Sequence, residues 1–226
     1  MVSAILTPAD HDAISAAVSR AEARTSGELV TVLADRSDGY SDIALAWAAL
    51  FGFGLIVLAG LFPAPLLALL DMVQGGWDTQ YAPGPVLEAG AALGIVGFLG
   101  LWLALGFDRL RFATVPGRVR TQRVHERAIS IFRVGAERRT HGRTGVLIYL
   151  SMQEHRAEIL ADEAIAAKVS DDIWGEAMAA MLVHLKRGDT TAGMVAAIER
   201  VGAVLTEHLP ADHTNPNEIP DRLIEI

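Results

Sequence analysis

The sequence predicts an α/β domain with a central sheet that is interrupted by a two-helix transmembrane hairpin. Two uncharged apolar runs, residues 43–70 and 89–107, are each long enough to cross a bilayer, since a hydrocarbon core of about 30 Å needs roughly 20 helical residues. On both sides of these runs, segments with the helical and strand patterns of a soluble protein alternate. Roughly 150 to 170 residues remain outside the runs, which is enough chain for one hydrophobic core.

The composition fits a membrane-anchored globular protein. Of the 226 residues, 51% are hydrophobic, and the mean hydropathy of +0.32 is high for a soluble domain because the excess lies mainly in the two runs. The chain has no cysteine, so disulfides, thiolate nucleophiles and cysteine-ligated zinc are excluded. The amino terminus lacks the basic start and apolar core of a signal peptide, and we expect no cleavage there.

The amino-terminal arm predicts a helix followed by a strand. Thr7 is a good helix cap, Pro8 suits the first helical position, and Asp10 places an acid in the first turn. The helix should stop near residues 25–27. Residues 29–34 are rich in valine and leucine, which predicts the first strand of the sheet.

The first membrane span is expected over residues 44–62, because Pro63 and Pro65 should end, kink or bend the helix there. The second is expected over residues 87–107. Glycines in both runs provide small surfaces for close packing of the two helices, although a pore or a dimer seam would use the same surfaces. Buried helices of a soluble core are the alternative to a hairpin in a bilayer. The aromatic residues placed to anchor the spans at the two interfaces are Trp47, Trp77 and Tyr81.

The charges that flank the spans predict their orientation. The connection over residues 71–84 contains Asp71 and Asp78 but neither lysine nor arginine, whereas six arginines follow the second run. Positive residues next to a span favour the cytoplasm, so both arms and both termini should be cytoplasmic, as in a two-span protein of a bacterial inner membrane. The six arginines are Arg109, Arg111, Arg118, Arg120, Arg123 and Arg127.

The second arm predicts the rest of an α/β domain. Residues 119–138 form a helix with one apolar face among arginines; contact with lipid headgroups explains these cations better than nucleic acid does. Residues 144–150 should be a buried strand, paired in a hairpin with residues 157–161. Ser170 should cap a helix that runs to Leu185, and a last helix should end before Pro210.

Two separated blocks of the chain combine motifs in a fixed order. The first block, residues 21–34, contains Thr25-Ser26-Gly27-Glu28 before the first strand. The second block, residues 144–210, contains the strand Thr144-Gly145-Val146-Leu147-Ile148-Tyr149-Leu150-Ser151 and the segment Arg156-Ala157-Glu158-Ile159-Leu160-Ala161-Asp162. Together these two blocks resemble the TPM domain family. The resemblance implies a small α-β-α sandwich, here split after its first strand by the transmembrane hairpin.

The resemblance also implies acid phosphatase activity or calcium binding, both of which need clustered carboxylates. Asp162, Glu28, Asp35 and Asp38 are the candidate ligands of Ca²⁺ or Mg²⁺, because strand ends in open α/β sheets usually bind ligands. Two positions differ from the family pattern. Many family members carry an acid or amide directly before the glycine that opens the strand, where this chain has Arg143-Thr144. Many also carry a glycine-rich turn after the next strand, where this chain has residues 161–164. A helix cap before Ile165 is the structural alternative for Asp162. The further acids considered are Glu158 and Glu163.

Motifs for other chemistry are missing from the sequence. The seven histidines show no HExxH spacing, and there is neither a glycine-rich phosphate loop nor a Gly-x-Ser-x-Gly elbow, so no catalytic residue is assigned. Ser151 has no base that the sequence identifies.

The organisation expected is a first domain segment over residues 1–41, a hairpin over 42–107, the remainder of the domain over 108–210 and an acidic tail over 211–226. The expected function is an interaction or assembly module for membrane proteins, with a metal-assisted phosphatase and a small oligomeric channel as alternatives.

Overall fold

The computed structural model describes residues 6–74, 81–135, 144–211 and 221–226. The chain divides into two compact units. The α/β unit comprises Met1–Asp38 and Arg118–Ile226, and the hairpin unit comprises Gly39–Gly117. Trp77, Asp78, Arg143, Asp212 and Glu218 lie outside the described residues.

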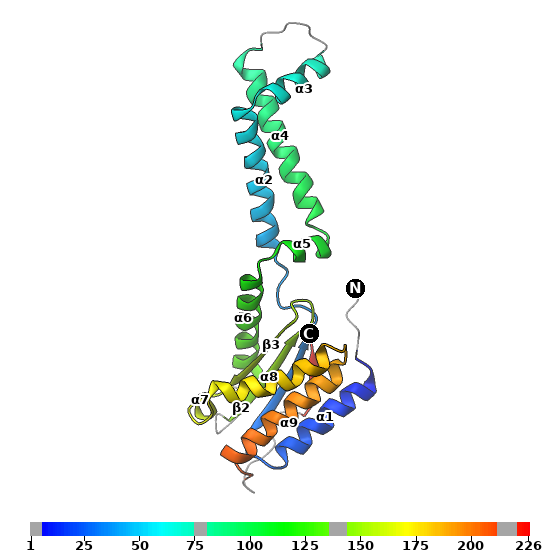
Figure 1. The fold of residues 1–226 in the computed structure, drawn as a ribbon, viewed down its shortest axis with the longest axis vertical. Coiled ribbons are helices and arrows are strands. Elements are labelled where there is room, and N and C mark those ends of the chain that lie inside the picture. Colours follow the sequence, from blue (N-terminus) through cyan, green and yellow to red (C-terminus); the bar gives the residue numbers. More distant parts are fainter. Residues whose placement is uncertain (1–5, 75–80, 136–143, 212–220) are drawn as a thin grey trace. The chain divides into compact units, whose positions relative to one another are not determined.

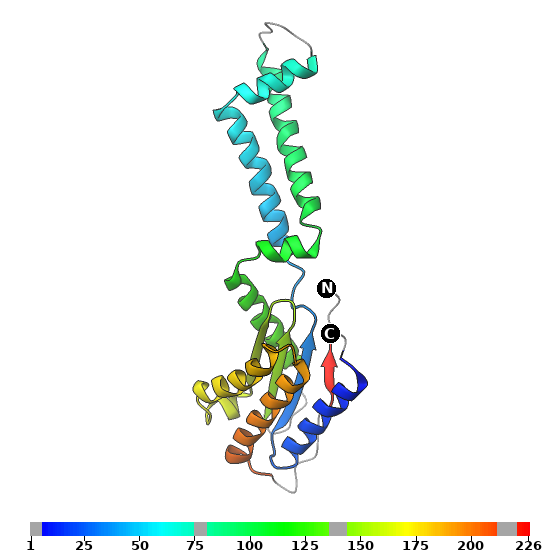
Figure 2. The same cartoon turned by 45° about the vertical axis from the view of Figure 1, so that its right-hand side comes forward.

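The α/β unit contains a four-stranded sheet in the order β3-β2-β1-β4 (Figures 1 and 2). Strand β1 (Glu28–Ala34) pairs in parallel with β2 (Gly145–Ser151) over its full length, from Glu28 opposite Gly145 to Ala34 opposite Ser151. Strand β3 (Arg156–Ala161) pairs antiparallel with β2, so the hairpin expected from the sequence is confirmed.

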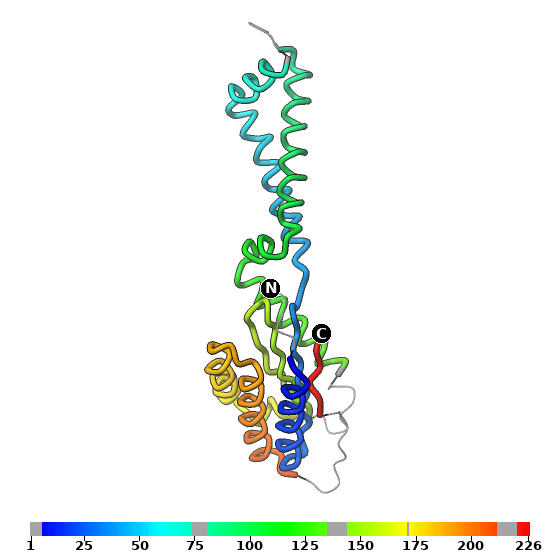
Figure 3. The backbone as a smooth tube through the Cα atoms, turned by 90° about the vertical axis from the view of Figure 1, so that its right-hand side faces the viewer, coloured from blue at the N-terminus to red at the C-terminus, as the bar shows by residue number. Residues whose placement is uncertain are grey.

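Helices cover both faces of this sheet, which makes the unit a three-layer sandwich. One face packs against α1 (Pro8–Glu22), α8 (Asp171–Leu185) and α9 (Thr190–His208), and α1 and α9 lie side by side (Figure 3). The core on this side contains Ile14, Ile148, Met181, Met194 and Ile198, all with no exposed surface. Successive side chains along a strand point to opposite faces of the sheet, so every second residue of a strand contributes to this core.

The other face packs against α6 (Gly117–Gly135), the arginine-rich helix after the hairpin unit. Its Val124 and Ala128 are fully buried against Val32 and Tyr149, and Phe132 packs at the margin. The expected amphipathic helix with one buried face is therefore confirmed.

The helix boundaries follow local signals. Thr7 and Asp10 form a reciprocal capping box at the start of α1, with Pro8 at the first position, as expected. A short helix α7 (Glu163–Ala166) follows β3. Asp189 caps α9 by accepting a hydrogen bond from the Ala192 N–H (2.9 Å).

The carboxyl-terminal residues differ from the expected acidic tail. Strand β4 (Leu223–Glu225) pairs in parallel with β1 at the edge of the sheet, and the Leu223 side chain is buried in the core. Because the acids Asp221 and Glu225 dominate the composition of this segment, the sequence does not indicate that Leu223 enters the core.

The hairpin unit contains α2 (Ser41–Leu61), α3 (Ala64–Gln74), α4 (Pro83–Ala104) and α5 (Asp108–Thr114). As expected from Pro63 and Pro65, α2 ends before the prolines and the remaining apolar residues form the separate helix α3. By length and composition, α2 and α4 are the two helices in the described residues that are able to cross a membrane. Only 17% of the apolar window of α2 and 11% of that of α4 is buried, unlike the helices of a soluble core.

Glycines bring α2 and α4 into backbone contact. A Cβ added to Gly52 would lie 2.8 Å from the Gly94 carbonyl oxygen and 2.9 Å from the Phe98 Cβ, whereas one added to Gly54 would meet nothing within 4 Å. Gly94 in turn lies against Gly52 and Ile56. The close approach is therefore a property of particular glycines rather than of the glycine content of the two helices.

We predict that Gly52→Ala weakens the packing of the hairpin while Gly54→Ala does not. Both substitutions raise helix propensity by about 1 kcal/mol, but the Gly52 methyl group must push against backbone atoms, at a cost of about 1–3 kcal/mol. Thermal unfolding of the detergent-purified protein, followed by circular dichroism, measures the difference. Equal melting temperatures for the two variants would contradict the glycine contact.

Candidate functional site

The topology divides the candidate carboxylates between two opposite edges of the sheet. Asp35 and Asp38 follow β1, at the edge where the parallel strands β1 and β2 end. Glu28 begins β1, and Asp162 follows β3, whose end lies beside the start of β2 because the two strands are antiparallel. At about 3.3 Å per residue, the length of β1 separates the two edges by roughly 20 Å. The four expected metal ligands are therefore not brought together.

The carboxyl edge instead contains a network of polar side chains, which we call the carboxyl-edge cluster: Asp35, Ser37, Tyr149, Ser151 and Glu154. The Ser37 hydroxyl lies 2.9 Å from the Tyr149 hydroxyl and donates a hydrogen bond to Ser151 Oγ at 2.9 Å. These contacts join the segment after β1 to the end of β2. The cluster therefore connects residues that are far apart in the sequence but adjacent at one edge of the sheet.

Glu154 lies at the centre of the cluster and is 1% exposed. Its Oε1 accepts a hydrogen bond from the Ser37 backbone N–H (3.1 Å), and its Oε2 accepts one from the Ser151 hydroxyl. The tight turn between β2 and β3 positions this residue, and His155 in the same turn adopts a left-handed conformation with φ of 52°. The hydrogen-bond donors compensate for the loss of water around a buried carboxylate.

Tyr149 projects from β2 toward α6. Burial raises the pKa of its phenol, with a smaller opposing effect from the hydrogen bond to Ser37. The hydroxyl therefore stays protonated at neutral pH and acts as a hydrogen-bonding group rather than as a base.

Asp35 and Asp38 each have partners of their own. Asp35 Oδ2 accepts a hydrogen bond from Gln153 Nε2 (2.9 Å), while its Oδ1 is buried without a partner among the described residues. Asp38 Oδ2 lies 3.1 Å from Arg123 Nε on α6. The two carboxylates thus fasten the segment after β1 to the β2–β3 turn and to α6.

At the opposite edge, Asp162 occupies the position before α7 but its side chain does not cap that helix. Asp162 Oδ2 accepts a hydrogen bond from the Gly145 backbone N–H (2.8 Å), and the residue is 4% exposed. The helix-cap interpretation is therefore wrong for the carboxylate, which binds the first residue of β2 instead. The Asp162 carbonyl oxygen accepts hydrogen bonds from the helix, from the N–H groups of Ile165 and Ala166.

Glu22 lies at the same edge, at the end of α1. Its Oε1 accepts a hydrogen bond from the Leu29 N–H (2.7 Å), and its Oε2 is buried without a partner among the described residues. Burial raises the pKa of this carboxyl from 4.5 to about 9, with Asp221 and Glu28 adding repulsion and the Leu29 bond opposing the shift. Glu22 is therefore a neutral acid at physiological pH.

The remaining acids do not complete a metal site. Glu158 Oε2 lies 3.3 Å from His125 Nδ1. Exposed Glu163 and buried Asp162 line a hollow of about 300 Å³ together with Arg133. Within the described ranges, no three His, Asp or Glu side chains are grouped so that they could hold a metal ion.

The carboxyl-edge cluster does contain a serine hydroxyl bonded to a carboxylate, an arrangement that activates nucleophiles in some enzymes. Ser151 has no exposed surface, however, and its hydroxyl already donates to Glu154. A substrate cannot reach it in this conformation. Glu154 is the acceptor for Ser151 that the sequence did not identify; its position three residues after Ser151, in the expected turn, was the available signal.

We predict that Glu154→Ala destabilises the α/β unit by about 3 kcal/mol, because the Ser37 N–H and the Ser151 hydroxyl lose a buried acceptor. Hydrogen–deuterium exchange of the β2 amides in the full chain measures the local effect. Glu176→Ala removes an exposed glutamate from α8 and serves as the control. Indistinguishable exchange in the two variants would show that the cluster carries no stability.

We predict that Glu22→Gln makes the protein more stable at pH 8 and flattens its pH dependence. Between pH 4.5 and about 9 the folded chain holds a proton on Glu22 that the unfolded chain has released. The free energy of unfolding therefore falls as pH rises through this window, by at most about 1.4 kcal/mol per pH unit for one proton.

Thermal unfolding of wild type, Glu22→Gln and the exposed control Glu207→Gln from pH 5 to pH 8.5 measures this slope. The control should follow the wild type. A wild-type profile with the same slope as that of Glu22→Gln would mean that Glu22 is ionised in the folded state.

Comparisons with known proteins agree with this fold. A family model described as the TPM domain matches residues 108–204, which extend from α5 into α9. The solved structure of the BA42 protein from the psychrophilic bacterium Bizionia argentinensis is 19% identical, covers 100% of this chain and 99% of its own, and superimposes with a TM-score of 0.57. At that identity the likeness concerns the fold alone. No curated protein matches the chain.

The matched range begins after β1. Because β2 and β4 both pair with β1, however, residues 21–34, the first block noted in the sequence, belong to the same domain as the matched range. The match of the domain model shows that the chain contains a TPM domain over residues 108–204, and the similar fold agrees with this match.

Proposed function

We propose that this chain is a membrane-anchored TPM-domain protein whose α/β unit is an interaction or assembly module for other membrane proteins. The anchoring in this proposal depends mainly on one observation: the outer faces of α2 and α4 are covered with exposed apolar side chains, including Phe53 at 69% and Leu103 at 65% exposure. Such faces need a covering of lipid or protein.

The dimensions of the two helices support anchoring in a bilayer. With 21 and 22 residues, α2 and α4 extend about 32 Å each, close to the thickness of a hydrocarbon core. At one end of this pair, aromatic side chains of the hairpin unit accompany Arg109 and Arg111. This combination is typical of a membrane–water interface. The aromatic residues are Tyr40, Trp47, Trp102, Phe107 and Phe112.

In the orientation that we propose, both arms lie on the cytoplasmic side of a bacterial inner membrane. Two crossings return the chain to the side from which it left, and the pairing of β1 with β2 requires both arms to be on one side. The arginines after α4 favour the cytoplasm for that side, whereas α3 and the described part of the connection carry Asp71 and no basic residue.

An interaction role suits the α/β unit better than catalysis does. The hydroxyl bonded to Glu154 is buried, and the carboxylates that a metal-assisted phosphatase would use lie at opposite edges of the sheet. We therefore do not propose the phosphatase. A channel is also not proposed, because α2 and α4 make backbone contact and the described parts of both helices carry no charge in their central turns.

We predict that single cysteines report this orientation, since the natural chain has none. In intact bacterial spheroplasts, a membrane-impermeant maleimide should label Ala82→Cys, before α4, and should label Glu207→Cys, on α9, only after lysis. The reverse pattern would overturn the orientation. Release of the wild-type protein from membranes by alkaline carbonate would overturn the anchoring itself.

The interaction role is tested by affinity purification of the full chain from detergent-solubilised membranes. We expect a membrane protein to co-purify in a fixed ratio and to remain bound at high salt. The absence of any specific partner in repeated purifications, with the chain folded and monodisperse, would contradict this role.

A further inference from the structure

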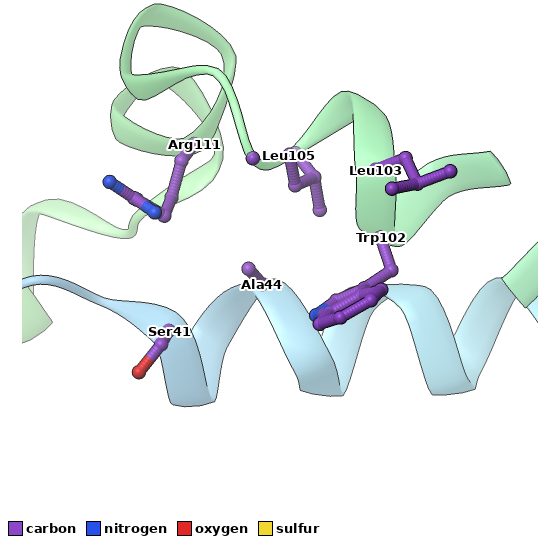
Figure 4. Close-up of a pocket in the computed structure, with 7 residues that line it drawn as sticks. Ser41, Ala44, Trp102, Leu103, Leu105 and Arg111 are labelled. Carbon is purple, nitrogen blue, oxygen red and sulfur yellow. The ribbon is translucent and has the colours of Figure 1, made fainter. Parts of the chain in front are cut away.

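A pocket of about 270 Å³ lies within the hairpin unit, at the end of the helix pair where the aromatic residues and arginines gather. Figure 4 shows Ala44 on α2 facing Leu105, with Trp102 and Leu103 on α4 at one side and Arg111 on α5 at the other. Ser41 and Gly106 complete the lining, and Arg111 is the one charged side chain among the described residues that line the pocket.

The helix α5 is held in place beside this pocket by two contacts with the start of α2. The rings of Tyr40 and Phe112 meet edge to face, with centroids 5.2 Å apart. Trp47 Nε1 donates a hydrogen bond to the Thr114 carbonyl oxygen (3.2 Å). These contacts fix the backbone that carries Arg111.

Arg111 is a cation with unused hydrogen-bonding capacity. Its side chain is 16% exposed, whereas its partner Asp108 is 58% exposed. The ion pair uses Nη2, and the buried Nε has no acceptor among the described residues. Because the Nε is inaccessible, a ligand in the pocket would meet the exposed part of the guanidinium, whose planar N–H groups match the oxygens of a phosphate.

We propose that this pocket binds the headgroup phosphate of a membrane phospholipid at Arg111, with the glycerol and first methylene groups against Ala44, Leu103 and Leu105. The inference rests on the proposed membrane anchoring. The charge complementarity with Arg111 selects a phosphate. The rest of the lining is mostly apolar, which favours a phosphate that carries hydrocarbon over free phosphate.

The acids near the pocket restrict the site to a single phosphate. Asp108 already neutralises part of the Arg111 charge, and Asp42 lies in the first turn of α2. A headgroup with an extra negative charge would meet these carboxylates. A phosphodiester with one negative charge therefore suits the site better than a phosphomonoester.

The test compares probes on the full-length protein in a mild detergent. We expect dioleoyl phosphatidylglycerol near saturation to raise the melting temperature by about 5 °C, because a ligand that binds only the folded state stabilises it. Dioleoylglycerol, which lacks the phosphate, and inorganic phosphate, which lacks the hydrocarbon, should each produce less than a third of that shift. If either of these probes shifted the melting temperature of the wild-type protein as much as phosphatidylglycerol does, the proposal would be overturned without any variant.

Variants assign the effect to the pocket. Arg111→Gln should lose most of the phosphatidylglycerol shift, and Arg111→Lys should keep more of it. Arg109→Gln, an exposed arginine on the same helix that does not line the pocket, should respond like the wild type. Equal losses in the Arg109 and Arg111 variants would indicate general attraction to an anionic surface and would overturn the site.

Carbonate extraction of the same variants separates this proposal from the anchoring on which it rests. If the protein resists extraction but phosphatidylglycerol gives no selective shift, the pocket proposal fails and the anchoring stands. If the wild-type protein is extracted, the anchoring fails.

Discussion

The parallel pairing of β1 with β2 is the constraint on which the rest of the α/β unit depends. Strand β1 is buried along its whole length and pairs with β2 on one side and β4 on the other, so the sheet cannot form without it. Its two neighbours come from the other arm of the chain. A lone helix and strand would bury too little surface to fold by themselves. The two arms are therefore one folding unit.

The hairpin makes this long connection less costly than its length implies. The entropy lost on closing a loop grows only slowly with length. Because α2 and α4 pack against each other in an antiparallel pair, the inserted segment begins and ends near the same end of the hairpin unit (Figure 1). A folded hairpin holds its two ends together, so the sheet does not have to close a long flexible loop. The glycine contact between α2 and α4 thus contributes indirectly to the pairing of β1 with β2.

The segments with strong local patterns were predictable from the sequence. The apolar face of α6 recurs with the helical period over several turns, and β2 is a continuous apolar run. The capping box of α1 depends on neighbouring residues only. Strand β4 was not predictable in this way, because its three residues are too few to show a period and only Leu223 enters the core.

The site was less predictable than the fold because it depends on strand direction. Asp162 follows a strand, as Asp35 does, and both were expected at one edge. The antiparallel hairpin of β2 and β3 reverses the direction and sends Asp162 to the other edge. The hairpin itself was expected, so its consequence for Asp162 was available from the sequence. The bond between Ser37 and Glu154 was not, since the two residues are 117 positions apart.

The two edges of the sheet accommodate buried acids in different ways. At the carboxyl edge, donors from Ser37 and Ser151 stabilise the Glu154 carboxylate. At the other edge, Glu22 has one donor, from Leu29, and negative neighbours, so it retains its proton instead. In both cases the carboxyl group is buried and forms hydrogen bonds within the fold. The groups that elsewhere serve as bases or metal ligands hold strands and turns together here.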